Sequence, residues 1–363
     1  GGGGGGLGLG PGGGAGVGTP ELGSLRKFLG EGELEDLWRQ PGKKLFHLSR
    51  ETSPFSDRAV YNQGLWKRWG APTSLEDYLM KAQLMDYEAT RAQFDAYTAM
   101  WSAERPATGA IYWMLNNAWP GLHWNLWDYY MRPAGSFFGA KTGLRVENVV
   151  FDYVRRAVWL VNRSLDKRGR RSVEVQVIAP DGKVVHRQTT HTTTAPNTSK
   201  NILSLGGAFG NAEGVVFIRL VLSGADGKVL SRNVYWVAKD PDVLDWENST
   251  WYHTPVTKYA DYTALNRLSP AHVEVDVVKS RHDEVAVTLE NKSAVPAFFV
   301  SLNLVDGEGK DVQPLTWEDN YVTLWPKERM RLKAKAVGTG KWEPSHVQVV
   351  GKNVNRRSVR VVR

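Results

Sequence analysis

The chain has 363 residues, of which 42% are hydrophobic and 23% are charged. These values predict a globular protein of two or three domains with substantial cores. No apolar run approaches the roughly eighteen residues of a membrane-spanning helix, so we expect no membrane partner. The absence of cysteine excludes disulfides, thiolate metal sites and a cysteine nucleophile.

The net charge of +8, with a pI near 9.4, would suit an acidic partner such as nucleic acid. However, the basic residues are scattered, and the densest runs, Lys167–Arg171 and Arg356–Arg357, fall where turns or strand ends are expected. We therefore expect a solvated basic surface and no nucleic-acid binding. The 15 tryptophans are a weak hint of sugar binding, since indole faces stack on sugars but are also common in cores.

Residues 1–24 are dominated by glycine. Such a segment buries too little apolar surface to offset the entropy that it loses on ordering, so we expect it to be disordered. A G-x-G-x-x-G match at Gly8, Gly10 and Gly13 predicts no dinucleotide site, because it lies in a polyglycine tract and follows no strand.

Residues 25–143 have a helical and aromatic pattern. Ser74 and Asp77 form an N-cap signature, after which apolar residues recur at helical spacing to about Trp101. This spacing predicts one long amphipathic helix. The apolar run Thr108–Leu115 follows and predicts a buried strand. A long helix that leads into a short apolar strand is typical of a βα repeat and favours a parallel barrel over an antiparallel sheet, so we assign residues 25–143 to part of such a barrel.

After Gly143 the sequence changes to short strands of alternating hydrophobicity, separated by turn signals such as Pro180-Asp-Gly182. Two such sets predict two immunoglobulin-like β-sandwiches, one over 144–240 and one within 241–363. The linker Asp240–Ser269 is expected to pack across the interface between them. The expected fold class is therefore α+β and multidomain. The predicted strands are Ala157–Asn162, Ser172–Ile178, Val215–Ser223, Asn233–Val237, His272–Val278, Glu284–Asn291, Ala297–Val305, Arg329–Val337 and His346–Val350.

The segment 112–130 holds four tryptophans and three tyrosines, interleaved with amides and one acid, directly after the predicted barrel strand. In a barrel, residues just past the C-terminal end of a strand face the active site. Amides and carboxylates there can bind sugar hydroxyls, and indoles can stack under the ring. The candidate substrate-binding residues are Asn116, Trp119, Trp113, Trp124 and Asp128.

Most of these candidates have a structural alternative. A hydrophobic plug that closes the barrel would use the same tryptophans, and Trp113 lies within the predicted strand, where it could be a core residue. Asp128 could contact a sugar hydroxyl or cap a short helix. For Asn116, at the mouth of the strand, the position favours a role in the site.

Two further patterns carry less weight. His186 and His191 lie in a Thr-rich stretch typical of a turn or an edge strand, and we expect no metal site there. Four asparagines, Asn162, Asn197, Asn248 and Asn291, match the N-glycosylation pattern. They are compatible with a secretory route, although chance alone supplies about one or two such matches.

The strongest signal is a series of collinear motifs: Lys81-Ala-Gln-Leu-x-x-Tyr-Glu88, Arg91, Thr108-Gly-x-Ile-Tyr-Trp-Met-Leu-Asn-x-x-Trp119, Phe138-Gly-Ala-Lys141, Ser231-Arg-Asn-Val-Tyr-Trp236, Trp251-Tyr-x-Thr-Pro255, Leu265-Asn-x-Leu268, Pro296-Ala-Phe298 and Leu324-Trp-Pro326. Together they resemble glycoside hydrolase family two, and within it the exo-β-D-glucosaminidases. Plant endo-β-mannosidases that act on N-glycan cores look similar.

The resemblance implies a longer enzyme in which a jelly-roll, a sandwich and a (β/α)8 barrel precede two more sandwiches. Such an enzyme removes β-linked glucosamine units from chitosan-like chains with retention of configuration and uses no cofactor or metal. The implied partner is a β-linked amino-sugar or mannose-containing oligosaccharide. This chain would supply the last barrel strand with its flanking helices, and the last two sandwiches.

The resemblance also indicates that the catalytic carboxyl groups are missing here. A retaining glycosidase needs one carboxylate as nucleophile and a second carboxyl as acid/base. No segment of this chain corresponds to the acid/base, and Gly12 falls where the family has its nucleophile. We therefore assign no catalytic residue and expect the chain alone to be inactive. The alternative is a non-catalytic carbohydrate-binding or scaffold protein.

Overall fold

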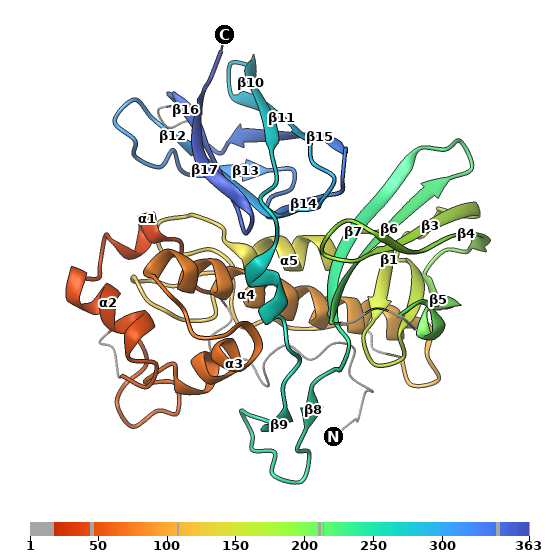
Figure 1. Ribbon diagram of the computed structural model, residues 1–363, viewed down its shortest axis with the longest axis horizontal. Coiled ribbons are helices and arrows are strands. Elements are labelled where there is room, and N and C mark those ends of the chain that lie inside the picture. The colour runs from red at the N-terminus through yellow and green to blue at the C-terminus, as the bar shows by residue number, and fades with distance from the viewer. Residues whose placement is uncertain are drawn as a thin grey trace.

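The computed structural model describes residues 18–43, 47–106, 109–209, 212, 214–338 and 342–362. It consists of a helical layer and two β-sandwiches (Figure 1). In this view the second sandwich lies above the helices, and the first lies beside the C-terminal half of the longest helix. The helices are α1 (Leu22–Leu25), α2 (Glu31–Arg39), α3 (Ala59–Trp69), α4 (Leu75–Ala99) and α5 (Gly135–Gly143), with the 3-10 helix η1 (Met100–Ser102) after α4.

The long amphipathic helix predicted from the sequence is confirmed as α4. The Ser74 hydroxyl accepts the Asp77 N–H at 3.1 Å, which satisfies one of the free donors of the first turn. The apolar stripe is buried, with Tyr78 and Ala82 fully enclosed. Because the 3-10 helix η1 follows α4 directly, the helical segment ends close to Trp101, as predicted.

Helix α5 packs very closely on α4 because glycines at four-residue spacing face it, at Gly135, Gly139 and Gly143. A Cβ atom at Gly139 would lie 2.3 Å from the Tyr87 carbonyl oxygen, so no larger residue fits without a shift of the backbone. This contact fixes α5, and with it the end of the preceding loop, against α4.

The expected disorder of residues 1–24 is wrong for the part that the structure describes. Thr19 is fully buried: its N–H donates to Asp86 Oδ2 at 2.7 Å, and Gln83 Nε2 donates to its carbonyl oxygen at 2.7 Å. Polar side chains of α4 thus hold this short stretch, which composition alone does not indicate. Residues 1–17 lie outside the described residues.

The predicted buried strand Thr108–Leu115 is also wrong for this structure. Residues 109–115 form no helix or strand, and Ile111 and Leu115 are 97% and 59% exposed. A strand needs a neighbour that bonds its backbone N–H and C=O groups. None of the described strands pairs with this segment, so its apolar side chains stay at the surface. The assignment of residues 25–143 to a barrel remains a prediction.

The first predicted sandwich is confirmed. Its antiparallel sheets have the strand orders β1-β2-β5 and β4-β3-β6-β7. Side chains from both sheets, among them Leu160 of β2 and Val175 of β3, form a core of their own. The strands are β1 (Glu147–Asp152), β2 (Ala157–Asn162), β3 (Gly169–Ile178), β4 (Val184–Thr194), β5 (Thr198–Ser204), β6 (Val215–Gly224) and β7 (Val229–Ala238).

The second predicted sandwich is confirmed as well, with the sheets β10-β11-β15-β13 and β14-β12-β16-β17. Its core continues into the helical layer, where the Phe299 ring packs on Tyr87 of α4 at 5.6 Å between centroids. The strands are β10 (Val273–Arg281), β11 (Glu284–Asn291), β12 (Ala297–Val305), β13 (Leu315–Trp317), β14 (Val322–Leu324), β15 (Arg329–Ala336), β16 (His346–Gly351) and β17 (Val354–Arg360).

The linker between the sandwiches packs on the helical layer, contrary to the expectation that it crosses the sandwich interface. It contains β8 (Val243–Leu244), β9 (Val256–Lys258) and the 3-10 helix η3 (Thr263–Arg267). Its Tyr262 ring stacks on Trp69 of α3 at 5.1 Å. The sandwiches contact each other directly, where Phe217 of β6 meets Phe298 of β12 at 5.0 Å between ring centroids.

Candidate functional site

The candidate segment 112–130 is an irregular loop that is anchored in its second half. Leu122 is 1% exposed, and its N–H donates to the His47 carbonyl oxygen at 3.0 Å. The Trp127 N–H donates to the Leu115 carbonyl oxygen at 2.8 Å, which ties the end of the loop to its start. In the first half of the loop, the Tyr112 ring packs on Phe94 of α4, whereas other side chains are exposed.

Three of the five candidate residues share this exposed first half. Trp113 and Trp119 are 71% and 64% exposed, and Asn116 between them is exposed as well. The core alternative for Trp113 therefore does not hold in this structure. Indoles on the surface present a flat face on which the C–H-rich side of a sugar ring can stack. That these three residues contact a sugar remains a prediction.

Trp124 belongs to an aromatic cluster. Its ring packs edge-on against Phe55 at 5.0 Å, and Phe55 also contacts Trp251 and Tyr252 of the linker at 5.8 and 5.6 Å. The sequence analysis did not associate Phe55 or Trp251 with this region. The contact is between residues nearly 200 positions apart, so no local spacing could have indicated it.

Asp128 is a turn-forming residue rather than an exposed ligand group. Its Oδ1 accepts the N–H of Tyr130 at 2.9 Å and the N–H of Arg132 at 3.0 Å, around Met131 at a φ of +63°. Burial raises the pKa of the Asp128 carboxyl, and hydrogen bonds from Ser24 and the Arg132 backbone oppose that rise. As in the helix-capping alternative, the carboxylate accepts backbone N–H groups, but these belong to a tight turn and not to a helix.

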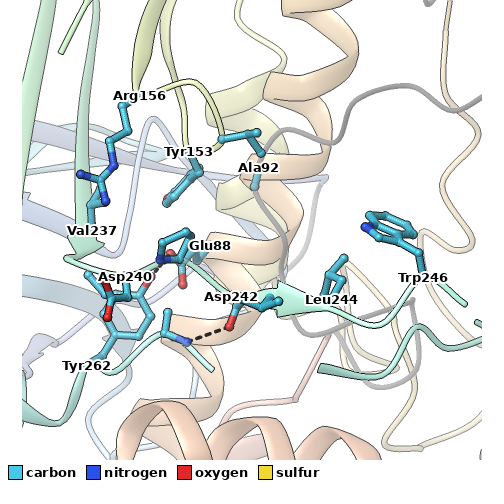
Figure 2. Close-up of a pocket in the computed structure, with 15 residues that line it drawn as sticks. Glu88, Ala92, Tyr153, Arg156, Val237, Asp240, Asp242, Leu244, Trp246 and Tyr262 are labelled. Atoms are coloured by element: carbon cyan, nitrogen blue, oxygen red, sulfur yellow. Dashed lines mark hydrogen bonds between the residues drawn. The ribbon is translucent and has the colours of Figure 1, made fainter. Parts of the chain in front are cut away.

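A cavity of about 380 Å³ lies elsewhere, between α4, the first sandwich and the linker. Figure 2 shows Glu88 near its centre between Tyr153 and Tyr262, with Trp246 at the far end beyond Leu244. The wall is largely apolar, and its carboxyl groups are those of Glu88, Asp240 and Asp242. None of these residues was predicted as a site, because they come from three distant parts of the chain.

Glu88 has the most unusual environment of these carboxyl groups. Tyr262 Oη donates to Glu88 Oε1 at 3.2 Å. Burial raises the Glu88 pKa to about 7, even though the nearby Arg68 and Arg91 guanidinium groups lower it. The side chain nevertheless keeps some exposed surface, which we attribute to the cavity because Glu88 lines it.

The other two carboxylates of the wall already have cationic partners. Asp242 forms a two-fold hydrogen-bonded ion pair with Arg68, at 3.0 and 2.7 Å, and also accepts the Ala260 N–H. Asp240 pairs with Lys258 at 2.8 Å. Among the described residues, no ion pair involves Glu88.

The remaining sequence candidates have structural explanations. Asn162 and Asn291 are completely buried, and each Nδ2 group donates to carbonyl oxygens of two loops: those after β2 and β4 for Asn162, and those after β11 and β14 for Asn291. Their burial excludes glycosylation of the folded chain at both positions. His186 and His191 lie on β4 an odd number of residues apart, so they point to opposite faces of the strand.

The structure places no metal site and no membrane-spanning helix in the part of the chain that it describes. No group of three or more His, Asp or Glu side chains there is arranged to hold a metal ion. In the same ranges, no helix combines the length and the apolar character needed to cross a membrane. Gly12, which would replace the nucleophile, lies outside the described residues.

Known protein families match both sandwiches. The Mannosidase Ig/CBM-like domain matches residues 155–239, and the Exo-beta-D-glucosaminidase Ig-fold domain matches residues 251–354. The chain is 50% identical over 353 residues to the exo-β-D-glucosaminidase of Hypocrea jecorina, which covers 95% of the chain. A mannosylglycoprotein endo-β-mannosidase of Lilium longiflorum is 28% identical over 173 residues, or 47% of the chain.

A solved structure agrees with these matches. The crystal structure of the Amycolatopsis orientalis exo-chitosanase superimposes on 95% of the chain with a TM-score of 0.86 at 31% identity. The chain spans only 39% of the length of the Hypocrea jecorina relative, 18% of the Lilium longiflorum relative and 41% of the Amycolatopsis orientalis chain. With the sandwich architecture in place, these matches show that the chain is homologous to the C-terminal part of exo-β-D-glucosaminidases.

Proposed function

We propose that this chain is the C-terminal part of a retaining β-glycoside hydrolase that removes glucosamine units from chitosan-type chains. The observation that carries the proposal is the 50% identity over 353 residues with a relative named exo-β-D-glucosaminidase. The identity to the endo-β-mannosidase is lower and covers 47% of the chain. A glucosamine-containing substrate is therefore the better choice of the two sugar classes.

In this proposal, residues 25–143 complete a barrel and the loop 112–130 forms one wall of the substrate pocket. Asn116 donates or accepts a hydrogen bond with a sugar hydroxyl, and the exposed indoles of Trp113 and Trp119 stack on sugar rings. Trp124 and Asp128 support this wall through the aromatic cluster and the tight turn, respectively. The two sandwiches, over 144–240 and 241–363, hold the helical layer in place.

A chimera tests the proposal. Residues 18–362 replace the matching region of the Hypocrea jecorina relative, and hydrolysis of glucosamine oligomers and of an aryl β-mannoside is measured. We expect cleavage of the glucosamine oligomers. A folded chimera that cleaves only the mannoside, or neither substrate, would contradict the proposal.

The same chimera tests the role of Asn116. Asn116→Ala should lower kcat/KM. The corresponding loss of transition-state stabilisation should be about 1–3 kcal/mol, the usual cost of a lost substrate hydrogen bond. Asn201→Ala, an exposed asparagine on β5, is the matched control and should leave kcat/KM unchanged. Unchanged kinetics in both variants would return Asn116 to a structural role.

A further inference from the structure

The cavity around Glu88 has the features of a ligand site separate from the proposed substrate wall. Its volume of about 380 Å³ falls in the usual range of small-molecule pockets, and its wall combines apolar side chains with a few polar groups. Trp246 at its rim is 65% exposed, and Tyr153 and Tyr262 line its interior. An indole at the rim of an apolar pocket is a stacking surface for a ring or a cation.

The polar groups of this cavity favour a cationic ligand. Asp240 and Asp242 are neutralised by Lys258 and Arg68, so Glu88 is the carboxyl that lacks an ion-pair partner among the described residues. Arg68 and Arg91 compensate the Glu88 carboxylate only from a distance, and an ammonium group in the cavity would offset the remaining cost of burying that charge. Arg156, the cation of the lining, turns away: its guanidinium donates to the Lys239 carbonyl oxygen and stacks over Phe209.

The cavity also holds a free hydrogen-bond donor. The Tyr153 hydroxyl is buried and donates no hydrogen bond to any described residue, although the Arg91 guanidinium lies close to its oxygen. In Figure 2 the Tyr153 ring lies directly beside Glu88. A ligand with both an ammonium and hydroxyl groups would use both side chains, whereas a simple metal ion or an aliphatic amine would leave the tyrosine hydroxyl unpaired.

We propose that this cavity is an accessory binding site for a short glucosamine oligomer, whose ammonium group meets Glu88 and whose ring stacks on Trp246. The choice of glucosamine rests on the proposed function, which supplies a polymer of ammonium-bearing rings. The site would hold the polymer on the sandwich side of α4, apart from the loop 112–130. It contributes binding only and requires no catalytic group.

The test is binding of a glucosamine trimer to the full chain at pH 7, measured by calorimetry, with the N-acetylated trimer as the uncharged control. We expect binding of the glucosamine trimer and a binding constant for the acetylated trimer that is weaker by roughly tenfold or more, because a charge-assisted hydrogen bond is lost. Equal binding of both trimers, or no binding of the glucosamine trimer, would overturn the inference.

Two variants with a matched control locate the site. Glu88→Gln keeps an oxygen for Tyr262 but removes the charge, and should weaken binding roughly tenfold. Trp246→Ala should weaken it by roughly three- to tenfold. Glu247→Gln, on the same linker but outside the cavity wall, is the control for both variants and should have no effect. If Glu88→Gln fails to fold, the comparison of Trp246→Ala with the control shows whether the trimer binds in the cavity.

The binding test and the chimera can fail independently. A chimera that cleaves glucosamine oligomers, together with a chain that binds no trimer, would reject the accessory site alone. A neutral mannose oligomer that binds in place of the glucosamine trimer, with the same dependence on Trp246, would reject the glucosamine specificity on which both proposals rest. Affinity that is unchanged in Glu88→Gln and in Trp246→Ala would place the ligand outside the cavity.

Discussion

Strand β11 and the segment 109–115 are both predicted to be strands from the sequence, yet only β11 becomes a strand. β11 has a hydrogen-bonded neighbour on each side, β10 and β15, and its Leu289 is fully buried. The segment 109–115 has no neighbour among the described strands, and its Leu115 is 59% exposed. The backbone partners available to each region therefore decide which of the two predicted strands forms.

The difference shows what each part of the chain can do by itself. Both neighbours of β11 belong to the same sandwich, so that region carries its own core and its own backbone partners. A barrel strand, by contrast, is completed by strands from other parts of the barrel. The sandwiches should therefore be stable in this chain. Hydrolysis of a sugar bound at the loop 112–130, by contrast, should require catalytic residues that the described part of this chain does not place beside the loop.

The largest expected effect is on catalysis. The purified chain should not hydrolyse an aryl β-glucosaminide, because retaining hydrolysis needs two carboxyl groups roughly 5–5.5 Å apart. Asp128, the one acid of the candidate segment, is held in a turn by backbone N–H groups. In another hydrolase class, loss of the nucleophile alone costs roughly a million-fold in rate.

The matching assay includes two carboxyl variants. Glu21, near the start of the described chain, accepts a hydrogen bond from the Tyr321 hydroxyl at 2.5 Å. Turnover by the wild-type chain that survives Glu21→Gln would show that the active site is misplaced. Turnover that Glu88→Gln abolishes would place the chemistry in the cavity instead.

A pair of leucine substitutions compares the two regions directly. Leu289→Ala in β11 should lower the free energy of unfolding by about 2–5 kcal/mol, because it leaves a cavity in a packed core. Leu115→Ala should change it by less than about 0.5 kcal/mol, since the side chain is largely exposed. The measurement is urea unfolding followed by circular dichroism. Equal losses would mean that the segment 109–115 is packed in solution.

A glycine substitution tests the contact that holds the helical layer together. Gly139→Ala places a Cβ atom against the Tyr87 carbonyl oxygen, so we expect a loss of about 1–3 kcal/mol in unfolding free energy. Gly207→Ala, in the 3-10 helix η2 (Gly206–Phe209), has no atom within 4 Å of the new Cβ and is the matched control. A Gly139→Ala chain as stable as the control would contradict close packing of α5 on α4.

Elements that depend on local pattern could be predicted from the sequence. The bounds of β2, β11 and β12 agree with the prediction, because period-two alternation and turn residues mark both ends of each strand. The start of α4 was marked by the Ser74 cap. The segment 109–115 could not be predicted in the same way, because strand formation depends on partners that lie elsewhere.

The candidate sites were less predictable for the same reason. The exposure of Trp119 and Asn116 agrees with a binding role, but composition could not distinguish them from Trp124, which packs on Phe55. The cavity around Glu88 was missed entirely. Its wall joins α4, the first sandwich and the linker, and no sequence spacing connects these elements.

A last expected effect is a pH dependence of stability that arises from two buried carboxyl groups of α4, one in the cavity wall and one outside it. Burial raises the folded-state pKa of Glu88 to about 7 and that of Asp95 to about 6, both above the ordinary carboxyl values. In the folded chain these groups bind a proton more tightly than in the unfolded chain. Their contribution to stability is therefore present in full below roughly pH 4 and is lost as the pH rises through the folded values.

Unfolding free energy measured between pH 4.5 and pH 7.5 should isolate the Glu88 contribution. Glu88→Gln removes the titration while keeping a neutral hydrogen-bonding group, so the fall in stability over this range should be smaller in the variant by about 1–3 kcal/mol. Glu247→Gln, which is exposed on the linker, should leave the slope as in the wild type.

The glucosamine trimer sharpens the comparison, because an ammonium beside Glu88 favours the ionised carboxylate. Its addition at pH 7 should raise the stability of the wild-type chain and of Glu247→Gln by more than that of Glu88→Gln. A slope that is identical in all three proteins would mean that water reaches the Glu88 carboxyl freely in solution.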